Sequence, residues 1–214
     1  MSTKLNRFTP LTGLVFAVLS LIAFATASSA PKASASGSKV IAFYKAHSSH
    51  ARASDLLWTV AFVFLVFFAA SICTMARRAP GSDGLRWIVG AGAAVLTGGA
   101  AVYFGFDFAL ATSSGDLSPA AAQALNLLAL KLYLPVGAGG VIFGVGAGLT
   151  IVRGSLLPTW IGWVGVVVGI LAVAGVLGLM LLVVWTALAS VLIFRRTEKL
   201  PSAKDGVEAQ AIPV

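Results

Sequence analysis

The fold is decided by one stretch, residues 160–194, which reads WIGWVGVVVGILAVAGVLGLMLLVVWTALASVLIF and has no charged side chain in 35 positions. A single α-helix of this length would be about 52 Å long, whereas the hydrocarbon core of a bilayer is about 30 Å thick. The stretch therefore predicts two membrane-spanning helices of about 16 residues each, joined by a tight turn near residues 174–178.

The composition of the whole chain indicates that it folds in lipid. Its 214 residues have a mean hydropathy of +0.96, 58% are hydrophobic and only 10% are charged. A soluble domain averages about 45–50% apolar and about 25% charged residues. So few charged residues cannot cover a surface in water. The sequence therefore predicts an all-α, polytopic membrane helical bundle in the cell membrane, with the lipid bilayer around it.

Four more apolar runs precede this stretch, at about residues 11–27, 54–76, 87–110 and 118–153. The fourth begins with Ser118 and Pro119, a hydroxyl N-cap followed by proline in the first turn. Pro135 interrupts this run and should kink the helix, because proline lacks an N–H and its ring clashes with the preceding turn.

Basic residues flank these runs, and their distribution predicts six spans with both termini in the cytoplasm. Six spans place ten lysines and arginines on the inner side and four on the outer side, whereas five spans give six and eight. Cytoplasmic loops carry the excess of basic residues, so six spans fit better. Trp87, Trp160 and Trp163 then lie near the inner interface, where amphipathic rings concentrate. The inner set is Lys4, Arg7, Arg77, Arg78, Arg86, Arg153, Arg195, Arg196, Lys199 and Lys204, and the outer set is Lys32, Lys39, Lys45 and Arg52.

The net charge of +8 does not indicate nucleic-acid binding. The basic residues lie at the ends of apolar runs, and no basic stripe stands apart from the membrane. We therefore expect no nucleic-acid partner.

The segments outside the spans differ in character. Residues 1–10 form a cytoplasmic N-terminus, and residues 11–196 form the six-helix transmembrane domain. Residues 197–214 have no apolar periodicity, and we expect a disordered cytoplasmic tail. In the outer loop, residues 39–51 show apolar side chains at helical spacing, which predicts a short amphipathic helix on the outer membrane surface.

The first apolar run also has features of a secretory signal. A basic start and an apolar core are followed by ATASSAPKASAS at residues 25–36, which resembles a small-residue cleavage site. The apolar core is long for a signal, so we expect this run to be retained as the first span. Cleavage is the alternative, and it would leave the orientation of the other spans unchanged.

Two ionisable residues, Asp107 and Lys131, lie within the predicted spans. Asp107 follows Arg86 by 21 residues and Lys131 precedes Arg153 by 22, so both lie about 32 Å above the inner interface. Charged side chains inside a bilayer are costly and mark candidate functional sites. We predict that Asp107 and Lys131 form an ion pair or share a water-filled pocket. The alternatives are a purely structural pair, or two side chains that extend to the outer interface and bind nothing.

The sequence predicts no catalytic residue, no metal site and no cofactor. His47 and His50 project to one face of a helix, but a metal site normally needs three or four ligands. The sequence contains no HExxH, GxSxG or CxxC motif and no glycine-rich phosphate loop. Its single cysteine, Cys73, lies in an apolar run and excludes an intramolecular disulfide. We expect no enzymatic activity.

Small residues recur every fourth position on three predicted helices, and this spacing lets helix backbones approach closely. We expect these residues to pack helices within one bundle, with a dimer interface or a glycine-lined pore as the alternatives. The repeats are Gly140, Gly144 and Gly148; Gly90, Ala94 and Gly98; and Gly165 with Gly169.

Three features carry a likeness to known sequences: IAFYKAH at residues 41–47, Pro135 midway along the fourth helix, and LPTWIGW at residues 157–163. With these features the chain resembles a group of uncharacterised, mostly actinobacterial multispanning membrane proteins. The resemblance covers residues 8–196 and implies a six-helix membrane domain of unknown function, without an established site. Many members of the group carry an acidic residue near the position of Lys131, and this departure argues against a shared charge-based mechanism.

Three functions follow as hypotheses. We expect an accessory or structural membrane component, with another membrane protein as its partner, because the spans carry glycine-rich faces and almost no charge. The alternative is a small transporter or carrier of an apolar or lipid-like molecule, with Pro135 as a hinge and Asp107 and Lys131 at an outward-facing site. A membrane-embedded enzyme is disfavoured, because no nucleophile, base or metal set is present.

Overall fold

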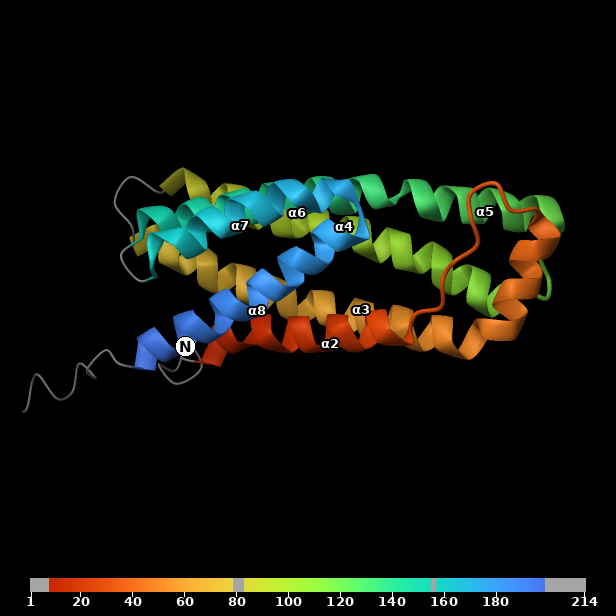
Figure 1. Cartoon of the computed structure of the whole chain (residues 1–214), viewed down its shortest axis with the longest axis horizontal. Coiled ribbons are helices and arrows are strands. Elements are labelled where there is room, and N and C mark those ends of the chain that lie inside the picture. Colours follow the sequence, from red (N-terminus) through yellow and green to blue (C-terminus); the bar gives the residue numbers. More distant parts are fainter. Residues whose placement is uncertain (1–7, 79–82, 155–156, 199–214) are drawn as a thin grey trace, which may run out of the picture.

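The computed structural model describes residues 8–78, 83–154 and 157–198, and these residues form a bundle of helices without a strand (Figure 1). The predicted all-α bundle is confirmed. Five of its helical stretches are long and apolar enough to cross a bilayer, which supports a membrane protein. The helices are η1 (Thr9–Leu11), α2 (Thr12–Thr26), α3 (Gly37–Arg78), α4 (Asp83–Ser113), α5 (Pro119–Lys131), α6 (Tyr133–Arg153), α7 (Thr159–Leu171), η2 (Ala172–Ala174) and α8 (Val176–Glu198).

The last apolar stretch folds as the predicted hairpin of α7 and α8. Gly175 makes the turn with φ of 112°, a left-handed conformation that suits glycine. Gly178 allows the two arms to approach, because a Cβ there would lie 1.7 Å from the Leu171 carbonyl oxygen. The arm Thr159–Ala174 is shorter than the five long stretches, at about 24 Å. The sixth crossing therefore remains a prediction.

The predicted break at Pro135 is also confirmed. Helix α5 ends at Lys131 and α6 begins at Tyr133, so the helix is interrupted just before the proline. Pro135 has no N–H to donate to the Lys131 carbonyl four residues earlier, and this lost hydrogen bond accounts for the position of the break. Ser118 caps α5 as predicted, since its Oγ accepts a hydrogen bond from the Ala121 N–H at 3.3 Å.

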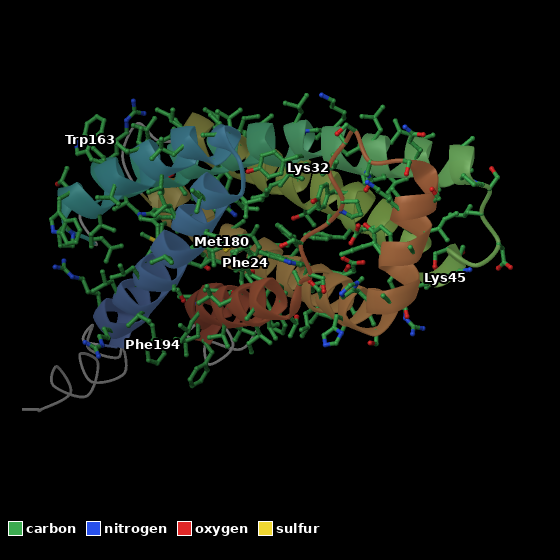
Figure 2. All side chains as sticks on the ribbon, turned by 45° about the vertical axis from the view of Figure 1, so that its right-hand side comes forward. Phe24, Lys32, Lys45, Trp163, Met180 and Phe194 are labelled. Carbon is green, nitrogen blue, oxygen red and sulfur yellow. The ribbon has the colours of Figure 1, made fainter. Side chains whose placement is uncertain are left out.

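The two ends of the bundle differ in composition. At one end, the Phe8 and Phe194 rings stack with their centroids 6.1 Å apart, so the first and last described helices meet there. Figure 2 shows Trp163 and Phe194 near this end and Lys45 near the other. We name the first the arginine end, because Arg77, Arg86, Arg153 and Arg195 lie there, and the second the cap end. The predicted cytoplasmic segments continue into residues 1–7 and 199–214, which lie outside the described residues.

The cap end is formed by helices that are longer than a bilayer is thick. With 31 residues, α4 is about 46 Å long, and α3 is longer still. The backbone of α3 departs from helical angles at His47, and the segment before this kink crosses the end of the bundle (Figure 1). We call the residues of α3 up to His47 the cap segment.

The cap segment corrects the prediction of a helix lying on the membrane surface. A helix does form at residues 39–51, but its apolar side chains pack on α4 and α5. Val40 and Tyr44 are fully buried in a small second core with Leu110 and Ala122. The amphipathic pattern was read correctly as a helix with one apolar face. Its partner is protein, because α4 and α5 extend far enough to cover that face.

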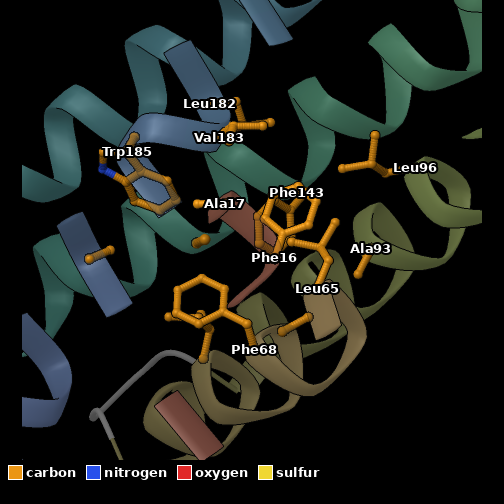
Figure 3. Close-up of a cluster of buried hydrophobic side chains, with 14 of the residues drawn as sticks. Phe16, Ala17, Leu65, Phe68, Ala93, Leu96, Phe143, Leu182, Val183 and Trp185 are labelled. Atoms are coloured by element: carbon orange, nitrogen blue, oxygen red, sulfur yellow. The ribbon is translucent and has the colours of Figure 1, made fainter. Parts of the chain in front are cut away.

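The main core lies between the cap and the arginine end and unites α2, α3, α4, α6, α7 and α8 (Figure 3). Phe16 of α2, Phe68 of α3 and Phe143 of α6 meet at its centre. The hydroxyl of Ser190 on α8 donates to the Pro10 carbonyl and accepts from the Leu14 N–H at 3.0 Å. The first apolar run is therefore part of the core, and its retention stays a prediction.

The glycine repeat of α6 packs within the bundle, as predicted. A Cβ on Gly144 would lie 2.4 Å from the Gly169 Cα of α7, and one on Gly148 would lie 2.5 Å from the Gly162 carbonyl oxygen. At these positions the backbones of α6 and α7 are in contact, and any side chain would force the helices apart.

The repeat of Gly90, Ala94 and Gly98 on α4 does not pack against another helix of the described bundle. The prediction that this repeat packs within the bundle is wrong. A Cβ on Gly90 or Gly98 would meet nothing within 4 Å, and both residues are exposed together with Ala94. The contacts with α6 are made instead by Gly92 and Gly99. The repeat of Gly90, Ala94 and Gly98 therefore faces outward, because α6 lies against the neighbouring face of α4.

Candidate functional site

The most polar buried position in the described bundle lies at the base of the cap, around Asp107. Its carboxylate accepts a hydrogen bond from the hydroxyl of Tyr44 in the cap segment. Tyr44 reaches it because the kink at His47 turns the cap segment across the ends of α4 and α5. The bond joins residues 63 apart in sequence and fastens the cap to α4.

A second carboxylate, Asp55 of α3, lies beside this pair. Asp55 is only 3% exposed, and its Oδ2 atom is buried without a hydrogen-bond partner. It is close enough to Asp107 for the two carboxylates to interact electrostatically. Among the described residues, no lysine, arginine or histidine forms an ion pair with either of them. A buried acid and a partly buried acid thus lie near each other, and neither has a basic partner in the described structure.

Two tyrosines interact with these acids, and the third tyrosine of the chain interacts with one of the two. Tyr44 and Tyr103 both interact electrostatically with Asp55 and Asp107, and Tyr133 interacts with Tyr103. The Tyr133 hydroxyl donates to the Ala172 carbonyl at 2.8 Å, which ties the site to the α7–α8 hairpin. We call Tyr44, Asp55, Tyr103, Asp107 and Tyr133 the acid–tyrosine cluster.

A small cavity adjoins the cluster. It has a volume of about 30 Å³, enough for about one water molecule and too small for an organic substrate. Tyr44 and Asp107 contribute to its walls, as does Ser54, the neighbour of Asp55 in sequence. The rest of the wall comes from the start of the α2–α3 loop and from the apolar side chains of Phe43 and Ala51.

The loop between α2 and α3 closes the cavity and is itself held by buried polar groups. The Asn126 Nδ2 of α5 donates to the Lys32 carbonyl at 3.3 Å, and the Ser54 hydroxyl donates to the Ala23 carbonyl at 3.0 Å. Figure 1 shows the loop crossing the bundle toward the cap end. The cavity is therefore covered by a loop that is held at Lys32 and that follows an α2 end held through Ala23.

Lys131 is not part of this site. It is exposed at the last residue of α5, and the described structure contains no ion pair between Lys131 and Asp107. The structure thus does not bring together the two residues that the sequence predicted as a pair. Equal depth in the membrane did not imply contact, because Asp107 faces α3, whereas the Lys131 side chain points away from the bundle.

Asp55 was missed, although a signal for it existed. It precedes Arg77 by 22 residues, the same spacing that places Asp107 and Lys131 about 32 Å above the inner interface. Asp55 lies at the start of the predicted span at residues 54–76, where charged side chains are ordinary, so the sequence analysis did not single it out. Tyr44 could not have been found in this way, because its position follows from the kink at His47.

The histidines take no part in a metal site. The His47 ring stacks on Phe43 with centroids 4.5 Å apart, and its Nδ1 lies 2.9 Å from the Phe43 carbonyl oxygen. His50 is exposed. Within the part of the chain that the structure describes, no three histidines, cysteines or acids are grouped to hold a metal ion.

A second feature is an open groove between α3 and α4, with a volume of about 580 Å³. The outward-facing Gly90, Ala94 and Gly98 form one wall, and Arg77 lies at the end nearest the arginine end. The Thr97 hydroxyl, also in the wall, is buried without a hydrogen-bond partner. The remaining lining residues are Val66, Ala69, Ala70, Cys73, Thr74 and Ala93.

Comparisons with protein-family models, curated proteins and solved structures return no match to this chain. Function must therefore be argued from the groove and the acid–tyrosine cluster.

Proposed function

We propose that this chain is an accessory component of the cell membrane that binds a transmembrane helix of another membrane protein in the α3–α4 groove. The proposal rests on the repeat of Gly90, Ala94 and Gly98, which has no packing role inside the described bundle. Small residues at this spacing allow a second helix backbone to approach closely. In lipid such close contact supplies much of the association energy.

The groove has further properties that suit a helix. Its volume of about 580 Å³ is far larger than that of the cavity beneath the cap. The Thr97 hydroxyl has no hydrogen-bond partner in the described structure. A second helix can supply a partner for it, whereas lipid tails have no hydrogen-bonding group. A non-enzymatic role is consistent with the buried acids, because the cavity beside them admits no organic substrate.

The proposed orientation places the arginine end in the cytoplasm and the cap outside the cell. Basic residues concentrate on the cytoplasmic side of membrane proteins. In this orientation Trp87, which is 71% exposed, lies at the inner interface beneath the Arg86 guanidinium, 5.0 Å from its ring centroid.

The experiment is photo-crosslinking in native membranes from a photoreactive residue at Ala94. We expect a covalent adduct with one other membrane protein, and we expect Gly98→Leu to abolish it. A side chain at Gly98 fits without disturbing the fold and fills the groove. Gly105→Leu is the matched control, because Gly105 is an equally open glycine of α4 outside the groove. An adduct that survives Gly98→Leu would contradict the proposal.

The second candidate is a carrier of a lipid-like molecule, and Arg77 favours it. A groove that ends at an arginine suits an acyl chain whose anionic head group pairs with the guanidinium. In the same experiment this candidate predicts a lipid adduct at Ala94 that Arg77→Gln weakens. A crosslinked dimer of the chain would instead identify the groove as an interface between copies.

A further inference from the structure

We propose that the acid–tyrosine cluster is a binding site for one exchangeable proton, carried by the buried Asp55 beside Asp107 at the base of the cap. The proposal is independent of the groove and of any partner that binds there. Four observations carry it: the burial of Asp55, its oxygen without a hydrogen-bond partner, the hydrogen bond that Asp107 accepts from Tyr44, and the cavity that adjoins Asp107.

The first step concerns charge. Two carboxylates in an apolar site repel each other when both are ionised, and a single proton held between them removes the repulsion. A basic side chain could achieve the same neutralisation. In the described structure no such side chain contacts either acid, since Lys131 is exposed and the histidines lie elsewhere. A proton is then the simplest compensating charge.

The second step concerns the hydrogen bonds. The Asp55 Oδ2 is buried without a partner, and an ionised oxygen left in this state is costly. A proton on Asp55 lowers that cost. Asp107 already accepts a hydrogen bond from Tyr44, which stabilises its ionised form. The geometry therefore favours Asp55 as the residue that carries the proton and Asp107 as the carboxylate.

The third step concerns exchange. The adjoining cavity holds about one water molecule between Asp107, Tyr44 and the α2–α3 loop. Ser54, the neighbour of Asp55 in sequence, lines this cavity, and release of the Asp55 proton to water that enters there leaves two carboxylates. Their repulsion then acts between α3 and α4 beneath the cap segment. Because the closed cap binds the proton and the opened cap exposes two ordinary acids, rising pH favours opening.

The described elements packed around the two acids carry few other titratable groups. Helix α2 has no ionisable residue. The groups that face or flank the acids are Tyr44 and His47 on the cap side of α3, Tyr103 on α4 and Tyr133 on α6. The tyrosines ordinarily ionise near pH ~10, so a measurement between about pH 7 and about pH 9 avoids most of their titration.

The test is infrared spectroscopy of the intact protein in lipid nanodiscs between about pH 7 and about pH 9. A solvent-exposed aspartate is ionised throughout this range, since its ordinary pKa is ~3.9. We expect a carbonyl band of a protonated carboxyl group near neutral pH, with loss of the band as the pH rises. Asp55→Asn and Asp107→Asn should each remove the band, whereas Asp116→Asn, at an exposed acid of the same end, should leave it unchanged.

Several outcomes would overturn the proposal. Absence of the band in the wild-type protein near neutral pH would do so, whether or not the variants fold. Persistence of the band in both Asp55→Asn and Asp107→Asn would assign the proton elsewhere. Loss of the band on addition of sodium or calcium chloride at constant pH would show that the site prefers a metal cation.

Discussion

At the scale of single residues, the hydrogen bond between Tyr44 and Asp107 matters most for the cap. This hydrogen bond joins the buried face of the cap segment to the end of α4, and its acceptor Asp107 belongs to the acid pair. It follows that the Tyr44 hydroxyl contributes more to stability than a tyrosine hydroxyl usually does. A comparison with Tyr103, in the same cluster, isolates this contribution.

We predict that Tyr44→Phe lowers the free energy of unfolding by about 1–3 kcal/mol, because it leaves the partly buried Asp107 carboxylate without its donor. The midpoint of thermal unfolding in mild detergent should fall by about 2–4 °C per kcal/mol. Tyr103→Phe is the control, since it removes the same atom from a cluster tyrosine that forms no hydrogen bond in the described structure. Equal losses in the two variants would contradict this account.

At the scale of the helices, the same glycine spacing has two different structural meanings. On α6 the glycines hold α7 in backbone contact, whereas on α4 the repeat faces outward into the groove. The difference arises from the rotation of each helix about its own axis. The rotation of α4 turns Gly92 and Gly99 toward α6, where Gly92 lies against the backbone of Phe143.

A pair of identical substitutions tests this difference. Gly144→Ala places a methyl group 2.4 Å from the Gly169 Cα, so α6 and α7 must separate, and we expect a loss of about 1–3 kcal/mol from overpacking. Gly98→Ala meets nothing within 4 Å, and we expect a change of less than about 1 kcal/mol in either direction. Unfolding in a denaturing detergent would measure both. A larger loss for Gly98→Ala would show that the groove face packs inside the bundle.

At the scale of the whole molecule, helices of unequal length create an asymmetric protein. The stretches α2, α7 and α8 are close to bilayer length or shorter, whereas α4 and the α5–α6 pair extend beyond it. The surplus at one end forms the cap and its small second core. The arginine end has no comparable extension in the described residues. The acid–tyrosine cluster lies where the cap meets the spanning part.

We predict that the cap faces the outside of the cell. In a Cys73→Ser background, a cysteine at Ser49, exposed in the cap region, should react with a membrane-impermeant maleimide on intact cells. A cysteine at Thr159, exposed at the arginine end, should react only after permeabilisation. Serine retains a donor for the Arg86 carbonyl that Cys73 contacts at 3.3 Å. The reverse labelling pattern would invert the proposed orientation.

The sequence by itself determined the features that depend on local chemistry. The long uncharged stretch predicted a hairpin, because no helix of that length fits a bilayer and Gly175 can adopt the turn conformation. Pro135 predicted the break between α5 and α6, because a missing N–H acts within one helical turn. Ser118 predicted the start of α5, because a side-chain cap also acts within one helical turn. Composition and charge predicted a helical membrane protein without reference to any contact.

Only the tertiary structure decided which residues meet. Spacing along the chain gives the depth of Asp107 and Lys131 but not the direction in which each side chain points, so the predicted pair was replaced by Tyr44, Asp55 and Asp107. A repeat of small residues on one helix predicts that a second helix can pack closely against it. The repeat does not predict which helix, if any, takes that position. The partner of each face depends on helix rotation and on the kink at His47. Both result from the packing of the whole core, and no local pattern records that packing.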